Sequence, residues 1–294
     1  MTTLHLLDAT YELFRAFFAL PSERSPAGQE VGAIRGLIGS VLALLRDLRV
    51  THIAAATDCV VTSFRNDLFA GYKTGAGVAP ELLAQFPLAE RALRTLGITV
   101  WPMIEFEADD ALASAAVRFE AAVERVVILS ADKDLCQCVR GQHVVAYDRW
   151  REKLFDEAGV LARFGVVPAA IPDFLALVGD TADGIPGIEG WGPKSAAIML
   201  QAYGSIANIP DDVGQWVVRP RGAERLAAAL AGQRAAATLY KQLATLRTDV
   251  PLHEQLADLS WQGVPRRAYQ EFCRELGFGK LAERPTIWAA EGPG

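Results

Sequence analysis

The sequence is poor in the residues that build disulfide frameworks and zinc sites. Its 294 residues include only four cysteines and four histidines. Four cysteines scattered over this length do not make a disulfide framework, and no histidine has a partner at the spacing typical of a zinc site. Cys136 and Cys138 form a C-x-C pair, but no second pair of cysteine or histidine accompanies it. We therefore expect ordinary buried thiols.

Long apolar runs are missing as well. No segment approaches the roughly 18–20 apolar residues that span a bilayer, and the first residues, MTTLHLLDAT, contain no basic region of a signal peptide. Hydrophobic residues make up 51% of the chain and charged residues 22%, which is typical of a globular protein with a large core. We expect a cytoplasmic protein without a membrane partner.

An excess of positive charge is also absent. The chain has 29 Lys and Arg against 35 Asp and Glu, a net charge of −6. Nucleic-acid-binding proteins are usually basic, so composition alone argues against a DNA partner. However, a cluster of metal-binding acids adds negative charge that bound ions later neutralise. The sign of the total charge therefore does not exclude DNA.

Short apolar runs alternate with helical patterns in the first half of the chain. The periodicity predicts strands at 4–8, 51–58, 97–103, 125–134 and 143–148, and helices at 31–48, 81–97 and 108–120. This alternation favours an α/β fold with a mainly parallel central sheet flanked by helices. From about residue 165 the pattern becomes helical, with a helix at 171–180 and a glycine-rich turn that leads into another helix within 181–204.

Acidic residues gather where the predicted strands end. The set consists of Asp8, Asp58, Asp132 and Asp134 after strands, Glu107, Asp109 and Asp110 in the stretch FEADDALAS, and Asp180 and Asp183 in the second half. One aspartate after a strand is usually a cap or turn residue. The whole set is not explained that way, because its members would repel each other unless a cation lay among them.

The acids are expected to meet, because the carboxyl ends of parallel strands share one edge of a sheet. Carboxylate oxygens in this number suit Mg²⁺ or Mn²⁺. Two such ions about 4 Å apart are a known device for cutting phosphodiesters, since they activate water and stabilise charge on the phosphorus centre. The sequence therefore predicts a site for two Mg²⁺ or Mn²⁺ ions.

A second motif, GIPGIEGWGPKSA (184–196), resembles a helix–hairpin–helix. Its glycines allow tight turns and close approach of a ligand to the backbone, and Pro193 suits the first turn of a helix. Free amides at a helix start attract anions, and Lys194 lies beside them. A plain turn between two helices would explain part of the pattern. The Pro-Lys-Ser that follows favours a sequence-independent contact with DNA phosphates.

Several blocks keep a common order along the chain: LLDATYELFRAFFAL (6–20), D-x-x-x-x-SFR (58–65), GYK (71–73), FEADDALAS (106–114), SADKDLCQ (130–137), VGDTADGIPGIEGWGPKSA (178–196) and RTDVPL (247–252). In these blocks the chain resembles the flap endonuclease / 5′-nuclease superfamily. The resemblance is to the 5′–3′ exonuclease domain of bacterial DNA polymerase I and its stand-alone bacterial relatives, and it covers about residues 4–255.

The resemblance implies an architecture. It predicts a PIN-like metal-dependent nuclease core over residues 1–165, with a helical arch at about 72–100. A helix–hairpin–helix (H3TH) DNA-binding subdomain is expected over 166–260, followed by a C-terminal tail, 261–294, that packs on the core.

The resemblance also implies roles for single residues. The metal-binding carboxylates would be Asp8, Asp58, Glu107, Asp109, Asp132, Asp134, Asp180 and Asp183, with Asp110 as a further ligand or acting through water. The catalytic group would comprise Lys73, at the base of the arch, with Asp132 and Asp134. DNA contacts would come from Arg65, Tyr72, Lys73, Gly190, Gly192, Lys194 and Ser195, and the hairpin would bind K⁺ through backbone oxygens.

The implied activity is that of a stand-alone, monomeric flap endonuclease and 5′–3′ exonuclease. It would remove flaps and RNA primers in replication or repair, acting on DNA with 5′ flaps, overhangs or nicks and on RNA–DNA hybrids. Four positions depart from the pattern. Ala76 and Gln85 stand where the family has basic arch residues, Ala9 follows Asp8 where the family often has glycine, and Gly184 follows Asp183 where it often has asparagine.

Three other functions were weighed against this one. A DNA-binding relative without catalysis, or with weak catalysis, would not need to hold repelling carboxylates together. A small RNA-cleaving domain with a similar core would lack the helical extension at 165–260. A phosphatase with an aspartate nucleophile would have D-x-D at Asp8, where this chain has Thr10 two residues later.

Overall fold

The computed structural model describes residues 2–290. Its six strands are β1 (Thr3–Asp8), β2 (His52–Asp58), β3 (Thr99–Met103), β4 (Arg125–Leu129), β5 (Val144–Asp148) and β6 (Lys153–Phe155). They form one sheet in the order β3-β2-β1-β4-β5-β6, in which only the pair β5–β6 is antiparallel. The α-helices are α1 (Ala9–Ala19), α2 (Gly32–Asp47), α3 (Arg65–Leu68), α4 (Pro80–Leu83), α5 (Phe86–Thr95), α6 (Ala108–Phe119), α7 (Glu157–Phe164), α8 (Ile171–Val178), α9 (Pro193–Tyr203), α10 (Ala223–Gly232), α11 (Arg234–Ala244) and α12 (Arg266–Leu276).

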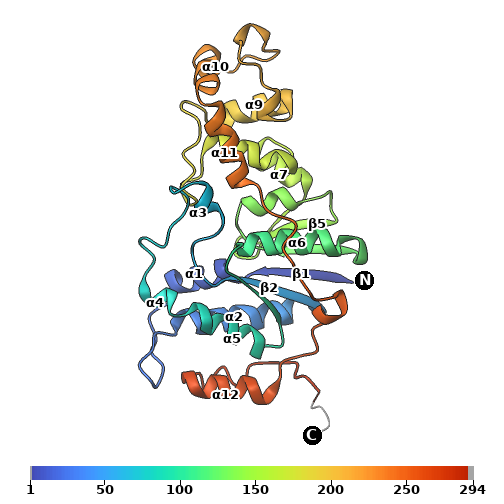
Figure 1. Cartoon of the computed structure of the whole chain (residues 1–294). Coiled ribbons are helices and arrows are strands. Elements are labelled where there is room, and N and C mark those ends of the chain that lie inside the picture. The colour runs from blue at the N-terminus through green and yellow to red at the C-terminus, as the bar shows by residue number, and fades with distance from the viewer. Residues whose placement is uncertain (1, 291–294) are drawn as a thin grey trace.

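Alternation along the strands divides the core between the two faces of the sheet. Side chains such as Leu7 and Ile53 pack against α1, α2, α5 and α12. Leu6 and Ala54, one position away in the pleat, pack with α6 on the opposite face. Figure 1 shows the resulting layers, with α6 above the sheet and α2 and α5 below it.

The helical second half has a core of its own. Residues of α8, α9, α10 and α11 pack together around Phe174, Met199 and Leu230. In Figure 1 these helices extend beyond α6, away from the α2 and α5 layer. The acids at the strand ends therefore lie where the sheet meets this helical part. Within residues 2–290 no single helix is long and apolar enough to cross a bilayer. Helix α7 and the segment Pro168–Val178 together are long and apolar enough to cross one, by length and composition only, but the chain bends by 44° between them.

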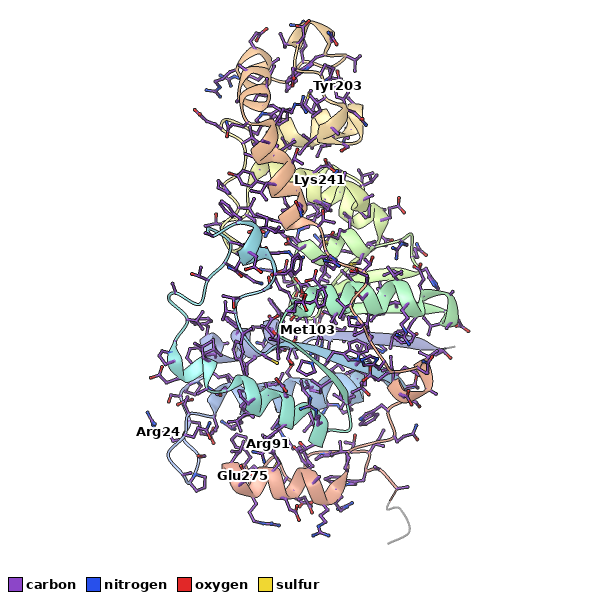
Figure 2. The ribbon with its side chains drawn as sticks, viewed as in Figure 1. Arg24, Arg91, Met103, Tyr203, Lys241 and Glu275 are labelled. Atoms are coloured by element: carbon purple, nitrogen blue, oxygen red, sulfur yellow. The ribbon has the colours of Figure 1, made fainter. Side chains whose placement is uncertain are left out.

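The C-terminal segment, predicted as the tail 261–294, is described as far as residue 290. Its helix α12 lies against α5, where Arg91 donates two hydrogen bonds to Glu275 at 3.0 and 2.8 Å (Figure 2). Tyr269 of α12 is fully buried. Residues 291–294, like Met1, lie outside the described residues.

The predicted fold class is confirmed, and several element boundaries differ from the predictions. The strand predicted at 125–134 ends at Leu129, so the acids that follow lie in a turn and a short 3₁₀ helix, Asp134–Cys138. The helix predicted at 81–97 is two helices, α4 and α5, broken before Pro87. β6 was not predicted, because three residues are too short to show a period.

The break reduces the predicted arch. Helix α5 buries Leu88, Ala92 and Leu93 in the core below the sheet, so it does not stand away from the core. Most of the exposed positions of the segment 72–100 lie within residues 74–84, which include Ala76 and Gly77.

Candidate metal centre and active site

The ends of β1 and β2 place the first two acids. Asp8 caps α1, and its Oδ1 accepts a hydrogen bond from the Tyr11 amide at 2.9 Å. Its Oδ2 accepts one from Ser130 Oγ at 2.7 Å, from the segment after β4. Asp58 lies beside it at the end of the neighbouring parallel strand and accepts a hydrogen bond from the Ala108 amide at 2.8 Å. Both carboxylates are therefore held at one edge of the sheet.

Glu107 caps α6 at the same edge. Its carboxylate accepts a hydrogen bond from Ser63 Oγ at 2.6 Å and pairs with Lys73 Nζ at 2.5 Å. Asp109 follows within the first turn of α6 and is partly exposed. The serine comes from the SFR block and the lysine from the GYK block, so three separate segments meet at this point.

The turn after β4 is fixed by its own side chains. Ser130 Oγ accepts a hydrogen bond from the Asp132 amide at 3.0 Å, and Asp132 Oδ1 accepts one from the Asp134 amide at 2.9 Å. Ser130 thus ties this turn to Asp8, and it brings Asp132 and Asp134 to the edge where Asp8 lies.

The loop that carries Asp180 and Asp183 is packed closely against the core. Gly184 has φ 71°, and a Cβ there would lie 2.2 Å from the carbonyl oxygen of Gly71. The Lys73 amide donates to the Asp183 carbonyl at 2.9 Å. Only glycine fits this contact without displacement of the backbone. The close approach sets Asp183 beside the lysine of the GYK block.

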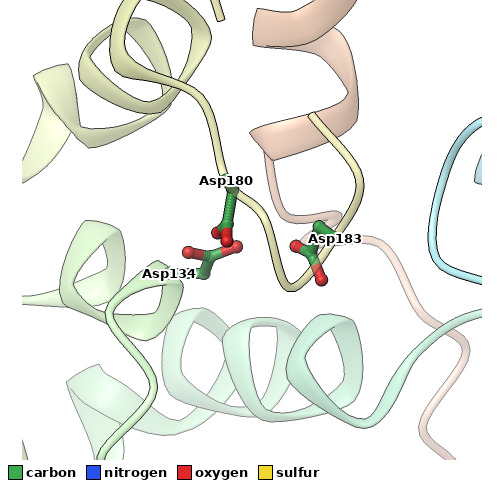
Figure 3. A group of neighbouring side chains, drawn as sticks. All are labelled: Asp134, Asp180 and Asp183. Carbon is green, nitrogen blue, oxygen red and sulfur yellow. The ribbon is translucent and has the colours of Figure 1, made fainter. Parts of the chain in front are cut away.

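Eight of the nine predicted acids come together. A cleft of about 320 Å³ is lined by Lys73 and by Asp8, Asp58, Glu107, Asp109, Asp132 and Asp183. At its other end, carboxylate oxygens of Asp134, Asp180 and Asp183 all lie within 4.8 Å of one another, as Figure 3 shows. Asp183 belongs to both groups and joins them into one acidic centre.

Asp110 does not belong to this centre, which corrects its prediction as a metal ligand. One residue along α6 turns a side chain by about 100° from Asp109, and the carboxylate of Asp110 is fully buried. Both of its oxygens accept hydrogen bonds from the guanidinium of Arg65 at 2.7 Å, and it also accepts from the Glu107 and Arg247 amides. These four bonds leave it no free side toward the cleft.

Arg65 and Tyr72 are likewise unavailable as DNA contacts, contrary to the prediction. Arg65 is 1% exposed and Tyr72 is 2% exposed. Besides Asp110, Arg65 donates to the carbonyls of Leu243 and Thr245 at 2.8 and 3.1 Å. Its role is to join α6 to the segment that returns from the helical part. Tyr72 packs among the buried side chains of the helical part.

Gln85 is also buried, so it does not mark a position on an exposed arch. It accepts a hydrogen bond from the Ile34 amide at 3.2 Å and donates to the Glu81 carbonyl at 3.0 Å. A basic side chain at this position would enter the core. Ala76, by contrast, is exposed.

Burial and mutual repulsion raise the pKa values of most of the clustered acids. Burial raises the pKa of Asp8 to about 7, although hydrogen bonds from Tyr11 and Ser130 oppose the rise. Burial, assisted by the charges of Asp132 and Asp8, raises the pKa of Asp109 well above its usual range. Burial raises the pKa of Asp183 to about 6, against the charge of Lys73.

Two groups favour their charged forms. Burial alone would lower the pKa of Lys73, but Glu107, Asp58 and Asp183 raise it. Burial alone would raise the pKa of Glu107, but Lys73 and Arg65 lower it. The ion pair between Lys73 and Glu107 therefore persists at neutral pH. It lies beside carboxylates whose negative charges are not balanced by nearby positive groups.

The residues present fit divalent cations. Asp134 Oδ1 is buried and has no hydrogen-bond partner among the described residues, and burial together with the charges of Asp132 and Asp183 raises the pKa of this carboxyl strongly. The donor atoms are carboxylate oxygens, which suit Mg²⁺ or Mn²⁺ rather than softer ions. A divalent cation would satisfy the unpaired oxygen and relieve the repulsion.

The glycine hairpin forms a rigid turn at the start of α9. Ser195 Oγ accepts from the Gly192 amide at 3.0 Å and donates to the Gly192 carbonyl at 2.9 Å. Trp191 is buried and donates to the Leu226 carbonyl at 3.1 Å, which fixes the turn to α10. Lys194 is exposed at the helix start, and a Cβ on Gly192 would meet no atom within 4 Å. Ser195 is therefore occupied in holding the turn.

Some residues of the site carry no role in the sequence-based predictions. Ser63 and Ser130 orient Glu107 and Asp8, and both lie within quoted blocks, where a hydroxyl beside an acid is the available signal. Lys133 lies between Asp132 and Asp134 in the sequence and pairs with Asp180. Arg225 of α10 lies against the hairpin, because a Cβ on Gly190 would lie 3.4 Å from its Nε. No local pattern reveals Arg225.

Comparison with known proteins places the chain. Residues 3–165 match the family model of the 5′-3′ exonuclease N-terminal resolvase-like domain, and residues 166–267 match that of the 5′-3′ exonuclease C-terminal SAM fold. The chain is 37% identical to a 5′-3′ exonuclease of Aquifex aeolicus over 210 residues, 71% of this chain and 72% of that protein. It is 36% identical to DNA polymerase I of Mycobacterium tuberculosis over 299 residues, 99% of this chain and 32% of the polymerase. The chain thus spans about a third of the length of the polymerase relatives.

Solved structures show the same fold. The 5′-exonuclease of bacteriophage T5 with bound zinc superposes with a TM-score of 0.69 at 16% identity, over 96% of this chain and 100% of that one. The catalytic core of Rad2 in complex with a DNA substrate gives a TM-score of 0.64 at 16% identity, over 96% and 91% of the two chains. With two family models that together cover most of its length, and an acidic centre built from their motifs, the chain belongs to the 5′–3′ exonuclease family.

Proposed function

We propose that this protein is a structure-specific 5′ nuclease that requires divalent metal ions and hydrolyses DNA near the junction of single and double strands. The observation that carries the proposal is the convergence of eight acids from five segments on one acidic centre, of which six line a single cleft beside Lys73. A module that only bound DNA would lose stability by holding these carboxylates together and would gain nothing for binding.

Two groups of acids would hold the ions: Asp8, Asp58, Glu107, Asp109 and Asp132 in the cleft, and Asp134, Asp180 and Asp183 at its end. Bound Mg²⁺ or Mn²⁺ supplies an activated water and stabilises charge on the phosphorus centre.

The protein's own groups position and complement the phosphate. Lys73 Nζ lines the cleft and is held by Glu107. It can therefore face the negative charge that develops on the phosphate oxygens. The cleft is also lined by Tyr11, Phe14 and Phe86. An aromatic wall of this kind can stack on an unpaired base, as entry of a terminal nucleotide into a buried cleft requires.

The hairpin would hold the duplex. Backbone amides in the first turn of α9 and the exposed Lys194 offer donors and positive charge to phosphates. The glycines leave the backbone open there, with no neighbour to a Cβ on Gly192. A K⁺ ion on the backbone oxygens of the hairpin is part of the proposal, and a K⁺-dependent rise in duplex affinity over Na⁺ would support it.

The proposed substrates are DNAs with 5′ flaps, 5′ overhangs or nicks, and RNA–DNA hybrids. The proposed task is removal of flaps and RNA primers during replication or repair in the cytoplasm, by a monomer. The exposed arch segment is short, so the free strand would pass beside Ala76 with few cationic contacts. Because few cationic side chains contact the free strand, we expect the protein to prefer long flaps less than a family member with basic arch residues does.

A labelled 5′-flap duplex tests the proposal. The protein is incubated with it in Mg²⁺, in Mn²⁺ and in EDTA, beside Asp132→Asn and the matched control Asp47→Asn, which changes an exposed acid on α2. Cuts near the junction in Mg²⁺ or Mn²⁺, lost in EDTA and in Asp132→Asn and kept in the control, support the proposal. Binding without cleavage in either metal would refute it in favour of a binding module.

A further inference from the structure

We infer that Lys133 is a tethered cation that holds the Asp134–Asp180–Asp183 end of the acidic centre and must leave it before a second divalent ion binds there. This inference rests on the proposed function and adds to it an unequal order of metal binding. It concerns a residue to which the sequence motifs assign no role.

The geometry of Lys133 is specific. Its ammonium pairs directly with Asp180 Oδ2, and it lies 3.9 Å from Asp134 Oδ1. Asp134 Oδ1 is the buried oxygen that has no hydrogen-bond partner among the described residues. The ammonium therefore lies among the oxygens that are close enough to share one metal ion. It adds positive charge where the carboxylates would otherwise repel each other without relief.

Several of the other acids have no lysine or arginine paired with them within the described residues. Among residues 2–290, no lysine or arginine forms an ion pair with Asp8, Asp109 or Asp132. Lys73 lines the same cleft, but the ion pair it forms is with Glu107. One end of the centre is thus open to a cation, and the other already holds one.

The consequence is electrostatic. A divalent ion at the Asp134 end would lie within a few ångströms of the ammonium and be repelled by it. Lys133 can move, because its side chain is 31% exposed and lysine is flexible. The second ion must therefore displace the ammonium into solvent. The first ion binds among Asp8, Asp109 and Asp132, none of which forms an ion pair with a lysine or arginine in the part of the chain that the structure describes.

Binding of Mn²⁺ to the DNA-free protein tests this without any reaction. Titration followed by the electron paramagnetic resonance of free Mn²⁺ counts the ions and their affinities. The wild type is expected to bind two ions, one at least tenfold more weakly than the other. Lys133→Gln should tighten the weaker site about tenfold and leave the stronger site unchanged. Lys133→Arg should keep the weak site, and Lys153→Gln, on the exposed edge strand β6, should match the wild type.

Thermal unfolding separates this role from a merely structural one. In EDTA the Lys133→Gln variant should melt below the wild type, because its acids repel each other. In saturating Mn²⁺ it should melt at or above the wild type. A variant that stays less stable in both conditions would show that Lys133 acts only in folding.

The inference would be overturned alone if the wild type binds two ions and Lys133→Gln leaves the weaker affinity unchanged or lowers it. If the wild type binds no Mn²⁺, the proposed function fails and this inference fails with it.

Discussion

Replacing Arg65 with methionine would separate a structural role from DNA binding at this residue. Arg65 is buried against Asp110 in a bidentate pair and joins it to the carbonyls of Leu243 and Thr245. Methionine fills a similar volume but leaves the carboxylate of Asp110 buried without its cation. Removal of one partner of a buried ion pair costs about 3–5 kcal/mol.

The magnitude has observable consequences. We expect Arg65→Met to lower the free energy of unfolding by about 3–5 kcal/mol. At about 2–4 °C per kcal/mol, the melting temperature should fall by at least roughly 6 °C. Urea unfolding followed by circular dichroism measures the first quantity, and calorimetry measures the second.

The chain offers a matched control. Arg91 also forms a bidentate pair, with Glu275, but the two side chains are 49% and 53% exposed. Exposed pairs contribute roughly 0–1 kcal/mol, so Arg91→Met should change stability little. The double variant Arg65→Met/Asp110→Leu should recover part of the loss, because no buried charge remains. Recovery is incomplete, since the Glu107 and Arg247 amides lose their acceptor.

One result would refute this reasoning. If Arg65→Met stays within about 0.5 kcal/mol of the wild type and instead loses affinity for a flap duplex in Ca²⁺, then Arg65 contacts DNA and the buried pair has been misassigned.

Three further predictions address the site. Gly184→Ala should destabilise the loop of Asp183 and reduce cleavage, because its Cβ would meet the Gly71 carbonyl at 2.2 Å. Gly28→Ala is the control, because Gly28 also has a positive φ, 83°, but has open space around it, so this variant measures only the cost of the backbone conformation. If Gly184→Ala and Gly28→Ala lose the same free energy of unfolding, the steric argument is wrong. In EDTA the free energy of unfolding should fall as pH rises from 6.5 to 8. The reason is that burial raises the pKa of Asp8 to about 7 and the folded state binds the extra proton. His5 does not affect this range. Burial lowers its pKa to about 4, so its effect on the free energy of unfolding changes with pH only below 6.5. Saturating Mg²⁺ should remove most of this dependence, and a flat profile in EDTA would contradict it. Lys194→Ala and Arg225→Ala should each weaken duplex binding and lower the slope of log affinity against log salt by about one. An unchanged slope in both variants, measured by fluorescence anisotropy, would move the DNA contact away from the hairpin.

Much of the architecture could be predicted because it depends on local patterns. The strands ending at Asp8 and Asp58 are continuous apolar runs that stop at an acid, and their short length identifies them as buried strands. Parallel order then brings the acids to one edge. The boundary errors have equally local causes. The strand predicted to reach Asp134 stops at Leu129, because the Ser130 hydroxyl and the Asp132 carboxylate accept hydrogen bonds from backbone amides in a turn, where a strand would pair with its neighbour.

The errors in the site have a different origin. Asp109 and Asp110 are neighbours in sequence, and only the direction of α6 decides that one faces the cleft and the other a buried guanidinium. Motifs record residue types and order but not which way a side chain points. Arg65 and Gln85 were misassigned for that reason. Arg225 was missed because its partner, Gly190, lies 35 positions away.

The loop between α8 and α9 joins two tasks on one short stretch of chain. Asp180 and Asp183 lie near its start and Gly190 and Gly192 at its end, so Asp183 and Gly190 are seven positions apart. Even fully extended, seven residues span at most about 25 Å. If the hairpin holds a duplex and the acidic centre cuts a strand, as proposed, the loop would fix the distance between these two points. The cutting position, counted in nucleotides from the junction, would then not depend on DNA sequence, and an insertion between Gly184 and Gly190 would shift it.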